Sequence, residues 1–205
     1  MKKSSVTKMR RINKLTSLPN FNGSNYNGNC TTWKDFHKVY KDIYEECRWQ
    51  ILIDEQKQQC GYTELYIGSL EDSHIDHYKK RSLFPNSTFD WDNFIVATKD
   101  NNFGANYKDN NYNIQVNEYV DIYNPVHDRV EDYFTYTEWG EIEETPGKVK
   151  KTVDVFNLNN EYLQKRRENI IKLIDAYKRG GLPLADIKST LLEYGFKSIV
   201  EQYCV

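Results

Sequence analysis

The sequence predicts an α+β fold, with helices at both ends of the chain and a short, turn-rich β region between them. Apolar residues recur at three- and four-residue steps in residues 33–59 and 159–178, which is typical of one face of a helix. Residues 60–110 are instead short, polar and rich in turn-forming residues. The 205 residues, of which 39% are hydrophobic, are enough for one domain with a sizeable core. We predict a single domain in three parts: an arm and helix (1–59), a β core (60–115), and a hairpin with a helical extension (116–205).

The N-terminal arm, residues 1–31, ends in a glycine- and asparagine-rich stretch that favours turns. A helix is predicted to begin after it, with Thr31 or Thr32 as the N-cap, because such side chains accept hydrogen bonds from the first free N–H groups of a helix. Its apolar face runs on to about Gln59 and is best interpreted as core packing. The face consists of Trp33, Phe36, Val39, Tyr40, Ile43, Tyr44 and Cys47.

The middle of the chain predicts two short strands. Residues 73–78 read as one strand, and residues 90–97 read as a turn that leads into a strand or the start of a helix. Residues 101–108 would follow as a short loop or helix.

The last third carries first β and then helical signals. Alternation and turn residues predict a hairpin from about Tyr133 to Val155. A helix is predicted from Asn159 to Lys178, ended by Gly180 and Gly181, and a last helix from Pro183 to Tyr203.

Charge and composition exclude several classes of protein. The net charge is −2 and the pI is about 6.1, whereas a passive nucleic-acid binder is usually strongly basic. Nucleic-acid contact must therefore be local or shared with a partner. We expect neither a membrane span nor a signal peptide, because no apolar run is long enough. The four cysteines show no CxxC spacing, so we expect a reduced, cytoplasmic protein. The basic start is either a local binding patch or a solvated arm; it consists of Lys2, Lys3, Lys8, Arg10, Arg11 and Lys14.

The residues that carry chemistry are Asp76 and His77, followed by Asn93 and Asn102. Hydrolysis of a phosphodiester near neutral pH needs a base that deprotonates water, and a neutral histidine suits this role. It also needs a divalent cation on hard oxygen ligands, which a carboxylate and an asparagine carbonyl provide. Each residue also has a plainer interpretation: a structural histidine, a turn acid, or an asparagine that caps a turn.

This set resembles the HNH motif, in which an acidic residue precedes a general-base histidine, a central asparagine follows, and a last Asn or His holds the metal. Asn93 lies sixteen positions after His77, and Asn102 lies nine positions after Asn93, which suits the strand–loop–strand–helix layout of that fold. The resemblance implies that His77 and Asn93 are catalytic, with Asn93 orienting the imidazole. It implies that Asp76 and Asn102 bind Mg²⁺ or Mn²⁺.

The flanking sequence is similar to an HNH subfamily that partners RecF- or SMC-like (PtuA-type) ATPases in bacterial anti-phage defence, the PtuB-like proteins of Septu and retron systems. The similarity runs from residues 9–12 to Arg166-Arg167, and residues 90–93 beside Asp76-His77 are its most specific part. It implies a ββα-metal core at residues 60–115, flanked by the N- and C-terminal helices and the extra hairpin. It also implies a metal-dependent endonuclease whose cleavage is gated by the ATPase.

The sequence departs from that family at four cysteine positions that commonly bind a structural zinc ion. Cys60 matches the first of them, but Thr63, Thr98 and Asn101 stand where the other three would be. Because one cysteine cannot hold that zinc ion, we expect no structural zinc. Phe and Trp side chains are expected to pack around the hairpin instead.

Side chains near the motif have two interpretations each. Lys79, Lys80 and Arg81 could bind the phosphates of a nucleic acid, or they could be a solvated charge run. His74 shares a strand face with Asp76, because alternate residues of a strand point the same way. It could therefore line the site or lie on the surface.

The last metal ligand and the function itself also have alternatives. Asn101 and Asn106 compete with Asn102 for the metal. The loss of the zinc ligands favours a catalytically inactive HNH-like adaptor that binds the ATPase, and a third hypothesis is a free-standing nuclease toxin. The metal-and-histidine chemistry would serve DNA or RNA, and we favour DNA over tRNA or other RNA.

Overall fold

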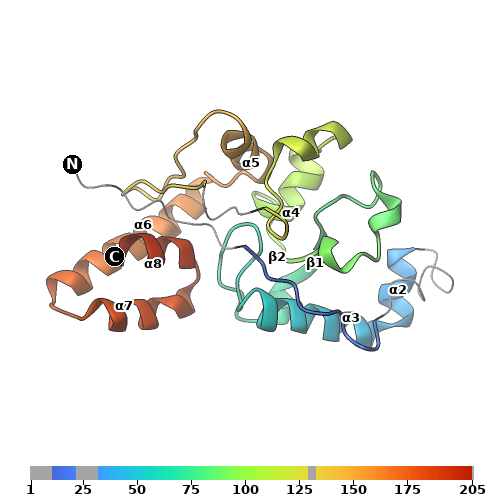
Figure 1. The fold of residues 1–205 in the computed structure, drawn as a ribbon, viewed down its shortest axis with the longest axis horizontal. Helices are drawn as coiled ribbons and strands as arrows, with labels where there is room; N and C mark the ends of the chain where they lie inside the picture. The colour runs from blue at the N-terminus through green and yellow to red at the C-terminus, as the bar shows by residue number, and fades with distance from the viewer. Residues whose placement is uncertain (1–10, 22–31, 129–132, 205) are drawn as a thin grey trace.

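A two-stranded antiparallel sheet lies at the centre of the computed structural model, which describes residues 11–21, 32–128 and 133–204 (Figure 1). Strands β1 (Ser73–His77) and β2 (Phe94–Thr98) pair with Ser73 opposite Thr98 and His77 opposite Phe94. A short helix, α4 (Gly104–Asn106), follows and continues as a wide, π-type turn over Tyr107–Tyr112. The α+β class is confirmed, and the chain from β1 to α4 runs in the order strand, loop, strand and helix.

Both faces of this small sheet are covered. Residues Phe94 to Ala97 of β2 are all completely buried, although successive side chains of a strand point to opposite faces. The run is apolar throughout, as expected for a strand that is buried on both sides. The sheet therefore lies in the core of the molecule and holds the end of β1 in a fixed position.

The predicted N-terminal helix is divided in two. Thr32, one of the two predicted candidates, is its N-cap, and its hydroxyl accepts a hydrogen bond from the Asp35 amide. Helix α2 (Trp33–Val39) ends at Tyr40, where the backbone leaves the helical region, and α3 (Lys41–Trp49) then begins and continues as a π-type turn over Gln50–Glu55. The apolar spacing continues through Tyr40, so the break gives no signal in the periodicity.

The hairpin predicted between residues 133 and 155 forms only over residues 135–143, and its second half is helical. A single bridge joins Tyr136 and Ile142, and the chain then turns at Gly147 (φ +98°) into helix α5 (Lys148–Phe156). The buried residues of α5 explain the correction, because their spacing fits one helix face better than an alternating strand. They are Val149, Thr152, Val153, Val155 and Phe156.

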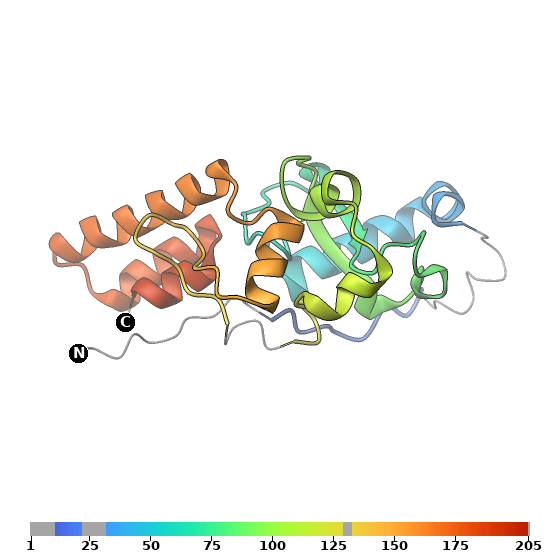
Figure 2. The ribbon, with the colours of Figure 1, turned by 90° about the horizontal axis from the view of Figure 1, so that it is seen from above.

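The C-terminal helices form a layer at one end of the molecule, and α2 lies at the other end (Figures 1 and 2). Helix α6 (Glu161–Arg179) has the predicted extent and ends at Gly180. The single last helix predicted over 183–203 is instead α7 (Leu184–Leu191) and α8 (Lys197–Tyr203). The chain is interrupted at Gly195, which has a φ of +85° and bridges to Leu65 in the central part.

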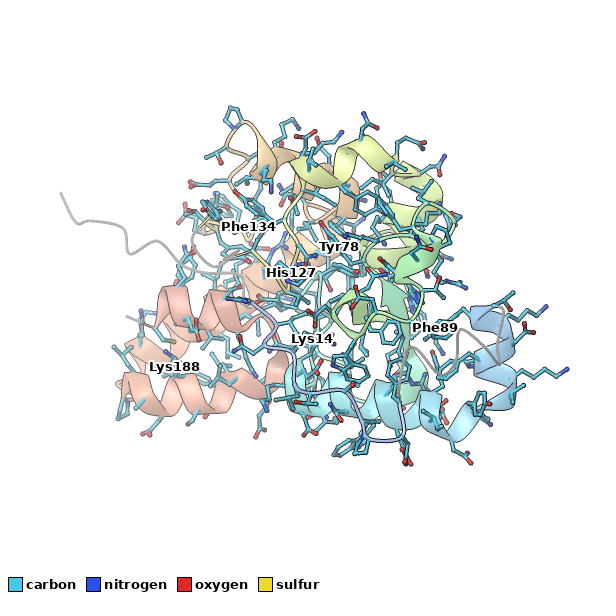
Figure 3. The ribbon with its side chains drawn as sticks, turned by 45° about the vertical axis from the view of Figure 1, so that its right-hand side comes forward. Lys14, Tyr78, Phe89, His127, Phe134 and Lys188 are labelled. Atoms are coloured by element: carbon cyan, nitrogen blue, oxygen red, sulfur yellow. The ribbon has the colours of Figure 1, made fainter. Side chains whose placement is uncertain are left out.

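The N-terminal segment is tied to the sheet by Lys14 (Figure 3). Its ammonium nitrogen lies 2.6 Å from Glu55 Oε2 and 3.1 Å from the carbonyl oxygen of Phe94. Arg11 is also engaged, because its Nε donates to the carbonyl of Val126. These two cations of the basic start therefore serve the fold, and the other four lie outside the described residues.

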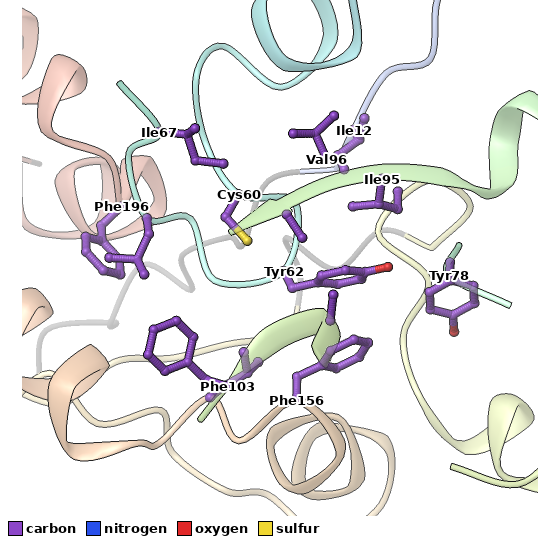
Figure 4. Packing of buried hydrophobic residues seen from close by; sticks show 14 of the residues in the cluster. Ile12, Cys60, Tyr62, Ile67, Tyr78, Ile95, Val96, Phe103, Phe156 and Phe196 are labelled. Atoms are coloured by element: carbon purple, nitrogen blue, oxygen red, sulfur yellow. The ribbon is translucent and has the colours of Figure 1, made fainter. Parts of the chain in front are cut away.

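The core continues from the sheet towards α5 and the C-terminal helices (Figure 4). The ring of Tyr62 stacks on Phe156, with 4.5 Å between the ring centres. Around β2, the ring of Phe94 contacts Trp33, Trp91 and Phe21. The predicted aromatic packing around the hairpin is confirmed. No helix of the described part is long and apolar enough to cross a membrane.

Gly195 and Gly181 allow a matched test of the contact that Gly195, in the C-terminal layer, makes with the backbone at Glu64 and Leu65. A Cβ at Gly195 would lie 2.6 Å from the carbonyl oxygen of Glu64, whereas a Cβ at Gly181 (φ +78°) would meet nothing within 4 Å. We expect Gly181→Ala to lower the free energy of unfolding by about 1 kcal/mol through backbone strain alone. Gly195→Ala should lower it by about 3 kcal/mol or more, because a backbone clash adds to that strain. Urea denaturation measures both values, and an equal loss of unfolding free energy in the two variants would contradict this role of Gly195.

Candidate functional site

His77 ends strand β1, and its ring is fixed on three sides. The ring centre lies 4.5 Å from that of Trp33 and 5.2 Å from that of Phe94. Nε2 lies 2.8 Å from the carbonyl oxygen of Thr88, in the loop between the strands. Because a carbonyl can only accept, Nε2 must carry the proton of a neutral imidazole. Nδ1 is then left with the lone pair that a general base needs.

The surroundings keep this imidazole neutral. His77 is only 4% exposed, and this burial lowers its pKa to about 4, although the Thr88 carbonyl and the charge of Asp76 act in the opposite direction. At pH 7 the ring is therefore neutral, which is the form that can accept a proton from water.

Asp76 is buried and charged. The Tyr62 hydroxyl donates to its Oδ2 over 2.6 Å, and the Lys108 ammonium donates to the same oxygen over 3.0 Å. Burial alone would raise the pKa of Asp76, but the ammonium of Lys108 and the hydrogen bond from Tyr62 outweigh it, so that the pKa is lowered. The carboxylate is thus held in its ionised form by two donors on one oxygen.

Lys108, which the sequence analysis did not single out, is the cation of this site. Its side chain comes from the π-type turn after α4 and is completely buried. Its ammonium also donates to the carbonyl oxygens of His77 (2.9 Å) and Tyr78 (3.1 Å), and lies 3.1 Å from Asp109 Oδ1. Burial by itself would lower the pKa of Lys108, but Asp76 and Asp109 raise it. In the sequence this lysine stands in a polar run that looks like a solvated surface.

Asn93 braces the loop between the strands. Its Oδ1 accepts from the Lys79 amide over 2.7 Å, and its Nδ2 donates to the carbonyl oxygens of Lys79 (3.2 Å) and Ser87 (2.9 Å). We predicted that Asn93 would orient the imidazole by a direct hydrogen bond. The structure gives that role to the Thr88 carbonyl, and Asn93 holds the loop that presents it.

Asn102 is not brought to this site. It is exposed and lines a separate cavity of about 740 Å³, together with Tyr66, Arg166 and other residues. Its backbone amide donates to Asp100 Oδ1 over 2.7 Å, and its backbone carbonyl accepts from Asn157 Nδ2 over 2.7 Å. These bonds fix the turn before α4 and keep Asn102 away from Asp76, so the predicted ligand pair does not converge.

A cavity of about 400 Å³ opens beside the end of β1. Lys80 and Arg81, two of the predicted phosphate-binding residues, line it together with His77 and Asp76. Lys79 does not line it, and its ammonium lies over the ring of Phe84. Asn106, one of the competitors of Asn102, and His74 are also present. The lining consists of His74, Ile75, Asp76, His77, Lys80, Arg81, Ser82, Asn106 and Asp109.

The donor set does not fit the divalent ion that the resemblance implies. A hard cation would need the carboxylate of Asp76 and oxygen ligands around it. In this structure the ammonium of Lys108 already occupies the Oδ2 side of Asp76 and lies against Asp109 as well. Asn102, the second predicted ligand, lines the other cavity. We therefore derive no chemical step from a bound metal.

Two of the four positions that the sequence analysis compared with zinc-binding cysteines lie together. The Thr98 hydroxyl donates to Cys60 Sγ over 3.9 Å, so the start of the turn and the end of β2 meet. Backbone bonds close that turn, since the Cys60 amide donates to the Leu65 carbonyl and the Glu64 amide to the Cys60 carbonyl. Hydrogen bonds thus hold this loop in place.

Comparison of the sequence with protein-family models and with curated proteins finds no match. The interpretation of the site therefore depends on its own geometry and on the resemblance in the sequence.

The buried imidazole predicts a pH dependence of stability. Its pKa is about 4 in the folded chain against an ordinary value of 6.5, so the unfolded chain binds the proton first as pH falls. The contribution of the neutral His77 ring to the free energy of unfolding is complete above pH 6.5 and is lost as the pH falls towards 4. The free energy of unfolding should therefore drop by about 2 kcal/mol between pH 7 and pH 5.

Urea denaturation at the two pH values measures this loss, with His77→Gln as the control that lacks the titrating ring. The carboxylate of Asp76 does not interfere, because its stabilisation is lost only below its ordinary pKa of 3.8. Equal pH dependence in both proteins would show that His77 is not the group responsible.

Proposed function

We propose that this chain is a nuclease that hydrolyses phosphodiester bonds, with His77 as the general base. The observation that carries the proposal is the bond from His77 Nε2 to the Thr88 carbonyl, beside a cavity lined by both cations and carboxylates. This bond fixes the tautomer and leaves Nδ1 as the basic nitrogen. A structural histidine would need no such cavity next to it.

Two cations of the cavity are suited to bind the phosphate. Arg81 is exposed, and the flat guanidinium can bind two phosphate oxygens at once. Lys80 is half-buried, and its ammonium is held by the carbonyl of Asp109 (2.6 Å) and by Asn113 Oδ1 (3.3 Å). Its position is therefore fixed before a substrate binds, which favours attack on a well-placed phosphorus.

The chemical step follows from these positions. His77 Nδ1 takes a proton from a water molecule, and the water oxygen forms a bond to phosphorus as the P–O bond to the leaving oxygen breaks. The leaving oxygen takes up a proton from solvent. Lys80 and Arg81 stabilise the charge that develops on the phosphoryl oxygens. Asn93 and Thr88 keep the imidazole in place throughout.

The biological setting is proposed from the resemblance. We propose a PtuB-like effector of anti-phage defence in the cytoplasm, gated by a RecF- or SMC-like ATPase, with DNA favoured as substrate. The net charge of −2 supports the need for a partner, because the chain by itself attracts nucleic acid weakly. Mg²⁺ or Mn²⁺ is implied by the family, but the predicted ligands do not support it.

A second candidate function is the catalytically inactive adaptor. It is favoured by the burial of His77, which is 4% exposed, and by the closed ion pair between Asp76 and Lys108. In that case the same contacts would only stabilise the hairpin, and the chain would serve to bind the ATPase.

The nuclease proposal predicts a specific loss in His77→Ala. The purified chain, with and without co-expressed ATPase, is assayed on plasmid DNA and total RNA. We expect the substitution to lower cleavage at least about 100-fold, since it removes the base. His127→Ala removes an exposed histidine outside the cavity and should keep full cleavage. Equal cleavage by both variants would contradict the role of His77, and a folded chain that cuts nothing but binds the ATPase would favour the adaptor.

A further inference from the structure

We propose that the ammonium of Lys108 is the resident cation of this site, in the place of a divalent metal ion, and that hydrolysis by this chain needs no metal. The inference rests on the proposed function for its activity, but the cation position itself can be tested without a substrate. Its basis is a completely buried lysine that joins both carboxylates of the cavity.

Four oxygen atoms surround the ammonium nitrogen. They are Asp76 Oδ2 at 3.0 Å, the carbonyl oxygens of His77 at 2.9 Å and Tyr78 at 3.1 Å, and Asp109 Oδ1 at 3.1 Å. Carboxylate and carbonyl oxygens are also the donors that hard metal ions choose. Three of these contacts are N–H···O bonds, as many as the ammonium has hydrogen atoms, and the fourth, with Asp109, is an ion pair.

Charge explains why the ammonium excludes a second cation. Lys108 is completely buried and places its positive charge within 3.1 Å of both carboxylates, those of Asp76 and Asp109. A divalent ion on Asp76 would lie within a few ångströms of that ammonium, where the repulsion is strong because it is poorly screened. Lys108 would have to leave the cage first, and its complete burial leaves it no solvated position nearby.

In this arrangement several residues share the roles that a metal ion would have. Lys108 keeps Asp76 ionised and fixes the backbone of His77 and Tyr78, which sets the position of the imidazole. It is fully buried, so it is a positioning residue that does not touch the phosphate. Lys80 and Arg81, which line the cavity, are left to stabilise the charge on the phosphoryl oxygens.

The first test measures the cation position directly, by Mn²⁺ binding in electron paramagnetic resonance and by the Tm with and without Mn²⁺. We expect no Mn²⁺ bound to the wild-type chain at this site and no rise in its Tm. Lys108→Met has a side chain of similar length without the charge, so two carboxylates remain unpaired. Its Tm should fall, and Mn²⁺ should bind and restore much of the loss. Adding Asp76→Asn should abolish that binding.

Lys38→Met, at an exposed position of α2, is the matched control and should behave as the wild type. Mn²⁺ binding to the wild type that Asp76→Asn abolishes would overturn the proposal. A folded Lys108→Met that binds no Mn²⁺ would also overturn it, because the position would then not suit a metal at all. Should Lys108→Met fail to fold, the comparison of the wild type with Asp76→Asn still decides.

The second test is cleavage in EDTA, with His77→Ala alongside. We expect the wild type to keep its activity within twofold after exhaustive removal of metals. Activity that depends on both His77 and added Mg²⁺ or Mn²⁺ would overturn the inference and leave the proposed nuclease standing. A chain that cleaves nothing, but shows the expected Mn²⁺ pattern, would end the nuclease proposal and still support Lys108 as the resident cation.

Discussion

The bonds of one ammonium group hold together the parts of this molecule on which the site depends. Lys108 donates to Asp76 and to two backbone carbonyls at the end of β1, and it lies against Asp109 on its own helical turn. The helix after β2 is thereby joined to the end of β1. A buried pair of this kind depends on further hydrogen bonds to its charged groups, and here the Tyr62 hydroxyl is a second donor to the same carboxylate oxygen of Asp76.

The aromatic packing supplies the second constraint. Phe94 and Trp33 cover two sides of the ring of His77, and this burial lowers the pKa of the imidazole, which is therefore neutral at pH 7. Backbone bonds around Cys60 and the stacked rings of Tyr62 and Phe156 fix the loop before β1. This part of the site is therefore ordered by hydrogen bonds and ring packing.

Much of the local structure could be predicted, because its signals lie within a few residues. The Thr32 cap, the two strands and the extent of α6 follow from capping groups, alternation and apolar spacing. The predictions that failed depend on distant contacts. Gly195 breaks the last helix because it pairs with Leu65. The second half of the predicted hairpin forms α5, which packs its apolar face into the core.

For the site, the sequence alone determined that Asp76 and His77 lie side by side at the end of a strand, with Asn93 at the start of the next one. Only the tertiary structure decided that Asn102 faces another cavity, that Thr88 orients the imidazole, and that Lys108 takes the centre of the site. The physical reason is that a lysine in a polar helical segment has the same sequence pattern whether it is solvated or buried. Its role is set by carboxylate and carbonyl oxygens some thirty residues away, which only folding brings to it.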